Sequence, residues 1–137
     1  MAHEKFQVEV LSPEGMVWSG EAEMVSTRTA TGSLGVLANH APLLGMLDPT
    51  EMRLYESESD VVRYAQGEGY IQVGGNRALL LVEEARPPDE LDASDLRDRL
   101  ERAERELESA EEDSEEQRVA TRDKRRWETF LEVAEGS

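Results

Sequence analysis

Residues 32–47 of the chain read GSLGVLANHAPLLGML, and this stretch decides how the N-terminal part folds. Glycine, asparagine and proline interrupt three short apolar runs, and helix-breaking residues at this frequency exclude a helix. Gly32 and Gly35 suit backbone positions that need a positive φ or a close approach by another strand. Asn39 and His40 are expected on a turn between two strands. The sequence therefore predicts a buried, tightly turned segment of a β domain.

His40 is the natural candidate for chemistry in this stretch. A lone histidine most often hydrogen-bonds its local backbone, and that is the interpretation we favour. A catalytic base would need a partner, and Asp48 is the nearest formal choice, which would make the chain a small hydrolase. Replacing His40 with alanine and losing only stability would exclude that alternative.

Short alternating runs continue on both sides of this stretch, from Phe6 to about Ala85. Phe6, Val8 and Val10 are predicted to share one face of a first strand, and Ala22, Met24 and Ser26 alternate along a third. Gly74, Gly75 and Asn76 are residues that adopt a positive φ readily, and three of them in a row predict a hairpin turn. Residues 78–82 are unbroken apolar, which is typical of a strand covered on both faces. About eight to ten such strands favour an antiparallel sandwich or flattened barrel.

The composition changes abruptly at residues 86–88, Arg-Pro-Pro. From Asp89 to Glu135 there is no glycine or further proline, and Glu, Arg, Leu and Ala dominate. Asp92 is placed to cap a first helix, and Ser114 follows a polar break at residues 111–113 and can cap a second. The spacing predicts an apolar seam on the first helix, formed by Ala93, Leu96, Leu100, Ala103, Leu107 and Ala110. The second helix is expected to bury Ala120, Trp127, Phe130, Leu131 and Ala134 against it.

The expected architecture is thus α+β in two parts. An N-terminal antiparallel β-sandwich of about ten strands, residues 1–87, precedes a C-terminal antiparallel two-helix hairpin, residues 88–137. A two-helix hairpin has little apolar area to offset chain entropy. We therefore expect the hairpin either to dock on a second surface or to change conformation.

The net charge of −16 restricts the partners. Such a field repels nucleic acid and anionic lipid headgroups, so neither is expected to bind, and no run is long and apolar enough for insertion into a membrane. The acidic surface, with lysine only at positions 5 and 124, fits either a high-salt habitat or ordinary solubility. Without cysteine, and with only His3 and His40, a zinc site is not expected.

No familiar catalytic motif is present in the sequence. There is no Walker-type phosphate loop and no Gly-x-Ser-x-Gly elbow, and paired carboxylates carry little information in so acidic a chain. The only basic cluster includes Arg122, Arg125 and Arg126, which either pair with glutamates of the first helix or meet an acidic partner. We therefore do not expect an enzyme in its own right, and no cofactor or metal is assigned.

The run Gly-x-Leu-Gly-Val-Leu-x-Asn-His-Ala-Pro-Leu beginning at Gly32 closely resembles the signature of the epsilon subunit of the F-type ATP synthase. Its flanks agree, from Phe6-x-Val8-x-Val10 and Ser12-Pro13-Glu14-Gly15 to the strand at residues 79–85. Only the family's Gly-Gly-aromatic strand departs, because Glu68 is inserted between Gly67 and Gly69. The resemblance covers the whole chain.

The resemblance implies a non-catalytic central-stalk subunit that couples proton transport to ATP synthesis at the cytoplasmic face of the bacterial plasma membrane. It implies that the sandwich links the gamma subunit to the ring of c subunits, and that the hairpin inhibits ATP hydrolysis by engaging the beta and alpha subunits of the catalytic hexamer. The expected partner-binding residues are Val36, Leu37, His40, Pro42, Leu43 and Leu44 in the sandwich and Arg122, Arg125 and Arg126 in the hairpin. Trp18 is expected either in the core or facing gamma.

Some bacterial members of this family bind ATP in the folded hairpin, through a Leu or Ile, then Asp, two residues, Arg and Ala. Here Leu91-Asp92 begins the motif, but Asp95 stands in place of its arginine. Asp92 and Arg99 are the remaining candidates for contacts with ATP as a regulatory ligand, and an anion in place of a phosphate-binding cation makes that binding weak or absent.

An alternative from another class is a stand-alone β-sandwich interaction module with an acidic helical tail. The apolar seam between Ala93 and Ala110 would serve a coiled-coil dimer equally well. A stable homodimer formed without gamma would favour this alternative.

Overall fold

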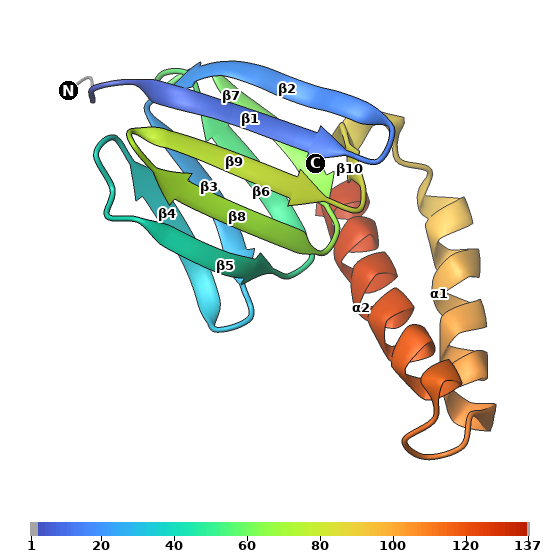
Figure 1. Ribbon diagram of the computed structural model, residues 1–137. Helices are drawn as coiled ribbons and strands as arrows, with labels where there is room; N and C mark the ends of the chain where they lie inside the picture. Colours follow the sequence, from blue (N-terminus) through green and yellow to red (C-terminus); the bar gives the residue numbers. More distant parts are fainter. Residues whose placement is uncertain (1–2, 137) are drawn as a thin grey trace. The chain divides into compact units, whose positions relative to one another are not determined.

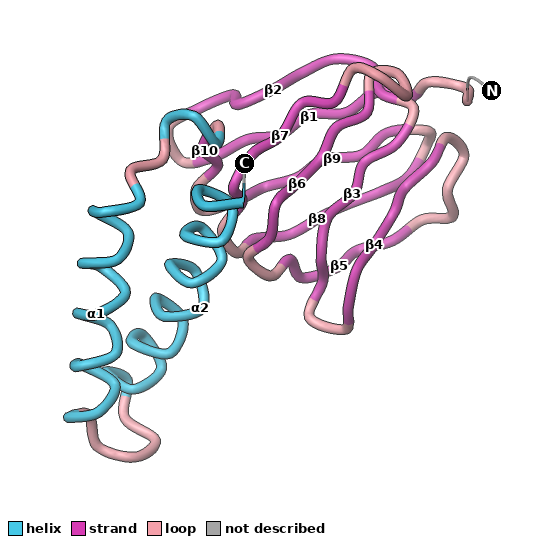
Figure 2. The backbone as a smooth tube through the Cα atoms, turned by 180° about the vertical axis from the view of Figure 1, so that it is seen from behind, coloured by secondary structure: helices cyan, strands magenta, loops and turns pink. Residues whose placement is uncertain are grey.

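The computed structural model describes residues 3–136, in two compact units that divide between Pro87 and Pro88. The first unit contains ten strands, and the second contains a short 3-10 turn, η1 (Pro88–Glu90), and two helices, α1 (Ala93–Ser109) and α2 (Glu115–Gly136). Figures 1 and 2 show the strands of the first unit from opposite sides. The expected β-sandwich followed by a helical hairpin is confirmed.

The strands pair into one continuous ladder that folds into two layers (Figure 1). One layer follows the order β10-β7-β6-β3, with β4 on the far side of β3, and the other follows β5-β8-β9-β1-β2. All pairs are antiparallel except β1 with β9, which run parallel. The strands are β1 (Phe6–Ser12), β2 (Gly15–Ala22), β3 (Met24–Thr29), β4 (Gly32–Leu37), β5 (Leu43–Leu47), β6 (Thr50–Tyr55), β7 (Val61–Gln66), β8 (Gly69–Gly74), β9 (Arg77–Val82) and β10 (Ala85–Arg86).

The core lies between the two layers and is lined by alternate residues of each strand. Phe6, Val8 and Val10 are buried together, as expected from their spacing. The alternation expected along β3 is present: Val25 and Thr27 point inward, while Met24 and Ser26 lie on the other face. Trp18 packs against the core.

A polar side chain also lies within this core. Gln66 of β7 is fully buried, and Thr27 of β3 donates a hydrogen bond of 2.5 Å to its amide oxygen. The amide nitrogen of Gln66 donates to the backbone carbonyls of Asp48, at 2.9 Å, and Gly67, at 3.0 Å. The hydrogen bonds of the amide offset the desolvation cost of burying it, and they join β3 and β7 to the corner between β5 and β6.

Two turns explain the glycine and asparagine signals in the sequence. Gly75 (φ 57°) and Asn76 (φ 59°) are the central residues of the β8–β9 hairpin and have the left-handed geometry of a type I′ turn. Gly32 has φ 133°, which also favours glycine. The expectation for Gly35 is wrong, since its φ is not positive and the nearest atom to an added Cβ is 3.9 Å away.

The caps expected in the helical unit are present. Asp92 is the N-cap of α1, and its Oδ1 accepts hydrogen bonds from the backbone N–H groups of Ser94 and Asp95. The hydroxyl oxygen of Ser114 accepts a hydrogen bond from the backbone N–H of Gln117 in the first turn of α2. Asp113 has φ 61° in the loop that reverses the chain.

The two helices bury few side chains against each other. Leu96 and Ala103 are buried on α1, and Ala120, Phe130 and Val133 on α2. The other predicted seam residues are half-buried: Ala93, Leu100 and Leu107 on α1, Ala110 at its C-cap, and Trp127, Leu131 and Ala134 on α2. The predicted seam is therefore in place but narrow, and Val133 was missed.

Gly69 supplies a direct test of the sandwich. A Cβ added there would overlap the backbone of Leu81 and Val82 in the neighbouring strand β9. We expect Gly69→Ala to lower the free energy of unfolding by at least about 2 kcal/mol, measured by urea denaturation, because backbone cannot move aside cheaply. Gly74→Ala is the matched control, since nothing lies within 4 Å of the Cβ added there. Equal stabilities of the two variants would contradict the close approach.

Candidate functional site

An exposed apolar surface covers the outer side of the β5-β8-β9-β1-β2 layer. Met46 pairs with Tyr70, Tyr70 with Leu81, Leu81 with Leu11, and Leu11 with Met16. Directly paired residues point to the same side of a sheet. These five residues, which we call the apolar row, therefore form one line across five adjacent strands.

The apolar row is open to solvent. The exposed fractions are 63% for Met46, 54% for Tyr70, 47% for Leu81 and 53% for Met16, and Leu11 is half-buried. Leu44, two residues from Met46 on β5, is 75% exposed. With strands about 4.8 Å apart, the row is about 19 Å long. Contiguous exposed apolar surface of this kind marks an interaction site.

The sequence interpretation missed most of this surface. The apolar run of β9 was predicted to be covered on both faces, but only Ala78, Leu80 and Val82 are buried, and Leu81 is exposed. An irregularity between Val10 and Leu11 brings Met16 opposite Leu11 on the outer side. The sequence did show that both faces of this strand carry apolar side chains. Such a pattern is found both in strands buried on two sides and in strands whose outer face binds a partner.

The predicted partner-binding residues of the sandwich do not all reach the surface. Val36 has no exposed area and lies in the core, so its side chain is excluded from any docking surface. Leu43 is half-buried and packs against the core. Leu37 and Leu44 are exposed, and Pro42 lies exposed in the loop between β4 and β5.

That loop, residues 38–42, is held in one conformation by side chains from distant segments. The backbone N–H of Asn39 donates to Oδ1 of Asn76, at 2.7 Å, and the Asn39 amide donates to a carboxylate oxygen of Glu4, at 3.0 Å. The His40 ring Nδ1 lies 2.6 Å from the carbonyl oxygen of Ala41, which confirms the local backbone bond expected for it. The loop is therefore a preformed, exposed edge of the sandwich.

The structure does not join His40 to Asp48 as a catalytic pair. His40 precedes β5 and Asp48 follows it, so the five-residue strand separates them by about 17 Å. Among residues 3–136, no three His, Asp or Glu side chains are grouped as a metal site. No helix of the described part of the chain is long and apolar enough to cross a membrane.

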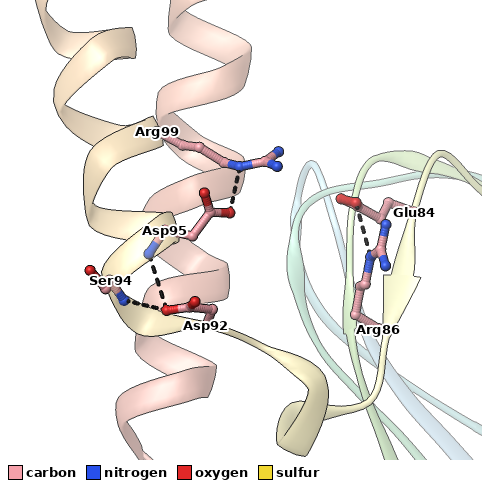
Figure 3. A network of polar contacts seen from close by, with 6 residues as sticks. All are labelled: Glu84, Arg86, Asp92, Ser94, Asp95 and Arg99. Carbon is pink, nitrogen blue, oxygen red and sulfur yellow. Dashed lines mark hydrogen bonds and ion pairs between the residues drawn. The ribbon is translucent and has the colours of Figure 1, made fainter.

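In the hairpin, the candidate ATP contacts are already engaged (Figure 3). Asp92 caps α1, and Nε of Arg99 donates to Oδ2 of Asp95 at 2.9 Å. A groove of about 590 Å³ beside them is lined by four carboxylates against two guanidinium groups. Its lining residues are Asp95, Asp98, Arg99, Arg102, Ala103, Glu106, Asp123 and Trp127. This excess of negative charge opposes the binding of an anion.

The basic cluster lies along α2. Arg122 and Arg125 are exposed, and Nη2 of Arg122 is 3.5 Å from Oδ1 of Asp123 on the same helix. The guanidinium carbon of Arg126 lies 5.6 Å from the centre of the Trp127 ring. These contacts are local to α2.

Comparison with known proteins gives one family. Residues 5–88 match the family model for the beta-sandwich domain of the ATP synthase delta/epsilon chain. The ATP synthase epsilon chain of Persephonella marina is 38% identical over 130 residues, which are 94% of this chain and 96% of the relative. The epsilon chain of Streptomyces avermitilis is 40% identical over 106 residues, which are 77% of this chain and 80% of the relative.

Solved structures show the same fold. A chain in the cryo-EM structure of the Euglena gracilis mitochondrial ATP synthase (OSCP/F1/c-ring) superposes with a TM-score of 0.76 at 22% identity, over 96% of this chain and 80% of that one. A chain of the Tetrahymena thermophila mitochondrial ATP synthase central stalk and c-ring gives 0.61 at 14% identity, over 98% and 99%. The family model and the relatives show that the chain belongs to the ATP synthase delta/epsilon chain family, whose members are non-catalytic subunits of that complex.

Proposed function

We propose that this chain is a central-stalk subunit whose sandwich binds gamma and rests on the ring of c subunits, and so couples ion transport to ATP synthesis. The observation that carries the proposal is the apolar row. A sheet supported by a core and exposing Met46, Tyr70 and Leu81 in register offers a stiff surface that transmits force without deforming. We assign the apolar row to gamma and the loop at residues 38–42, with His40 and Pro42, to the c-ring.

The hairpin supplies the regulatory part of this proposal. Its few buried side chains make the closed form marginal, so a second conformation costs little. We assign Arg122, Arg125 and Arg126 to an acidic surface on the beta or alpha subunits, reached when the hairpin opens. The assembled subunit would then lie peripherally, at the cytoplasmic face of the bacterial plasma membrane.

The alternative of an oligomerising tail receives less support. Leu96 and Ala103 of the α1 seam are buried within the single chain, against α2. A coiled-coil dimer through this seam would first have to displace α2.

Substitutions in the apolar row test the gamma assignment. We expect Leu81→Ser to weaken binding to purified gamma by about tenfold or more in calorimetry, because it places a hydroxyl at the centre of the row. The melting temperature should change little, since the side chain is already exposed. Val119→Ser, which removes an exposed apolar side chain from α2, is the control and should leave the affinity unchanged. Equal affinities of the two variants would remove the apolar row from the interface.

Truncation tests the role of the hairpin. An assembled ATP synthase that carries the chain ending at Pro88 should still synthesise ATP, because the sandwich is a separate compact unit. ATP hydrolysis should rise above that of the intact complex as the inhibiting element is lost. A complex that loses synthesis, or in which hydrolysis falls, would contradict this division of roles.

We further propose that ATP is not a regulatory ligand of this hairpin. The acidic lining of the groove beside Asp95 and Arg99 supports this, since phosphate oxygens would face four carboxylates. Calorimetry on the isolated chain should detect no sub-millimolar binding of ATP, with or without Mg²⁺. Saturable binding in that range would overturn the proposal.

A further inference from the structure

Trp127 of α2 occupies an unusual position between charged groups of both helices. The guanidinium carbon of Arg99, on α1, lies 5.0 Å from the centre of the indole ring, and that of Arg126 lies 5.6 Å from it. Phe130 meets the ring edge to face, with centroids 5.8 Å apart and planes at 84°. One half-buried indole thus connects a cation of α1 to the aromatic part of the α2 seam.

The remainder of the helix interface is small enough for this contact to matter. Among the described residues of the two helices, five side chains are buried, and two of them, Ala103 and Ala120, are alanines. Residues 88–137 carry eighteen acidic and nine basic side chains, so like-charge repulsion opposes the closed hairpin. Neither helix has a basic residue in its last turn to offset the helix dipole.

An ion pair also links the two helices, but its surroundings make it weak. Arg97 and Glu135 form an ion pair of 3.2 Å, but both side chains are more than half exposed. Exposed pairs contribute little because water and salt screen them. Arg99 and Asp95 are about as exposed, but Asp95, one turn earlier, holds the Nε of Arg99 at 2.9 Å and so orients its guanidinium toward the indole.

We propose that the contact between Arg99 and Trp127 is a latch that sets how often the hairpin opens. Cation–π contacts at partly exposed sites correspond to a change of about two- to fivefold in an equilibrium constant. The latch itself is a property of the isolated chain. Its consequence for ATP hydrolysis rests on the proposed function.

The test is a distance measurement across the hairpin. The chain has no cysteine, so Glu101→Cys on α1 and Glu128→Cys on α2, both at exposed positions, carry spin labels specifically. Double electron–electron resonance in a urea series then gives the equilibrium constant for opening. We expect Arg99→Gln, in this labelled full-length chain, to raise that constant about two- to fivefold.

Three matched variants separate the latch from general charge effects. Arg97→Gln removes the same charge from the same helix and should change the constant less than twofold. Asp95→Asn keeps Arg99 but weakens the ion pair that orients its guanidinium. It should raise the equilibrium constant for opening by less than Arg99→Gln does and by more than Arg97→Gln does. Trp127→Leu keeps an apolar side chain in the seam, and Arg99→Gln added to it should have no further effect. Equal effects of Arg99→Gln and Arg97→Gln, or additive effects of Arg99→Gln and Trp127→Leu, would overturn the proposal.

The proposed function is tested separately with the same variant. Arg99→Gln in the assembled ATP synthase should alter hydrolysis if an open hairpin inhibits it. If opening in the isolated chain changes as expected while hydrolysis does not, the latch stands and the regulatory role of the hairpin fails.

Discussion

The sandwich depends on the alternation of side chains in the β5-β8-β9-β1-β2 layer. Each strand sends one set of apolar residues into the core, and the neighbouring positions of β5, β8 and β9 send a second set outward. Because the side-chain period is two, a shift of one residue in any strand would exchange the two sets. The close approach of β9 at Gly69 and the type I′ turn at Gly75 and Asn76 fix this register. One constraint thus sets both the stability of the sandwich and its exposed apolar row.

The helical unit is held together much more weakly than the sandwich. Its caps at Asp92 and Ser114 define where the helices begin, but only five of its described side chains are buried, and its charge is strongly negative. A structure held this weakly responds to small changes in free energy. The chain therefore combines a unit whose shape is strongly determined with one whose conformation is easily shifted, as a subunit that both transmits force and regulates would require.

The sequence predicted the elements better than it predicted the surface. Turn chemistry and apolar spacing located the two units, the hairpin caps and the alternation of β1, because these depend on local residues. They failed for β9, where burial on both faces was expected but Leu81 is exposed. Whether a strand face is exposed depends on which other elements cover it. The order of strands in the sheet determines this, and the local sequence does not. The apolar row, assembled from residues as distant as Leu11 and Leu81, follows from that order.

We expect the apolar row to be covered in the assembled complex. Hydroxyl-radical oxidation with mass spectrometry measures this directly, because methionine and tyrosine side chains react when exposed. Met16, Met46 and Tyr70 should be readily oxidised in the isolated chain and strongly protected in the assembled ATP synthase. Equal oxidation of these three side chains in the isolated and the assembled subunit would contradict this expectation.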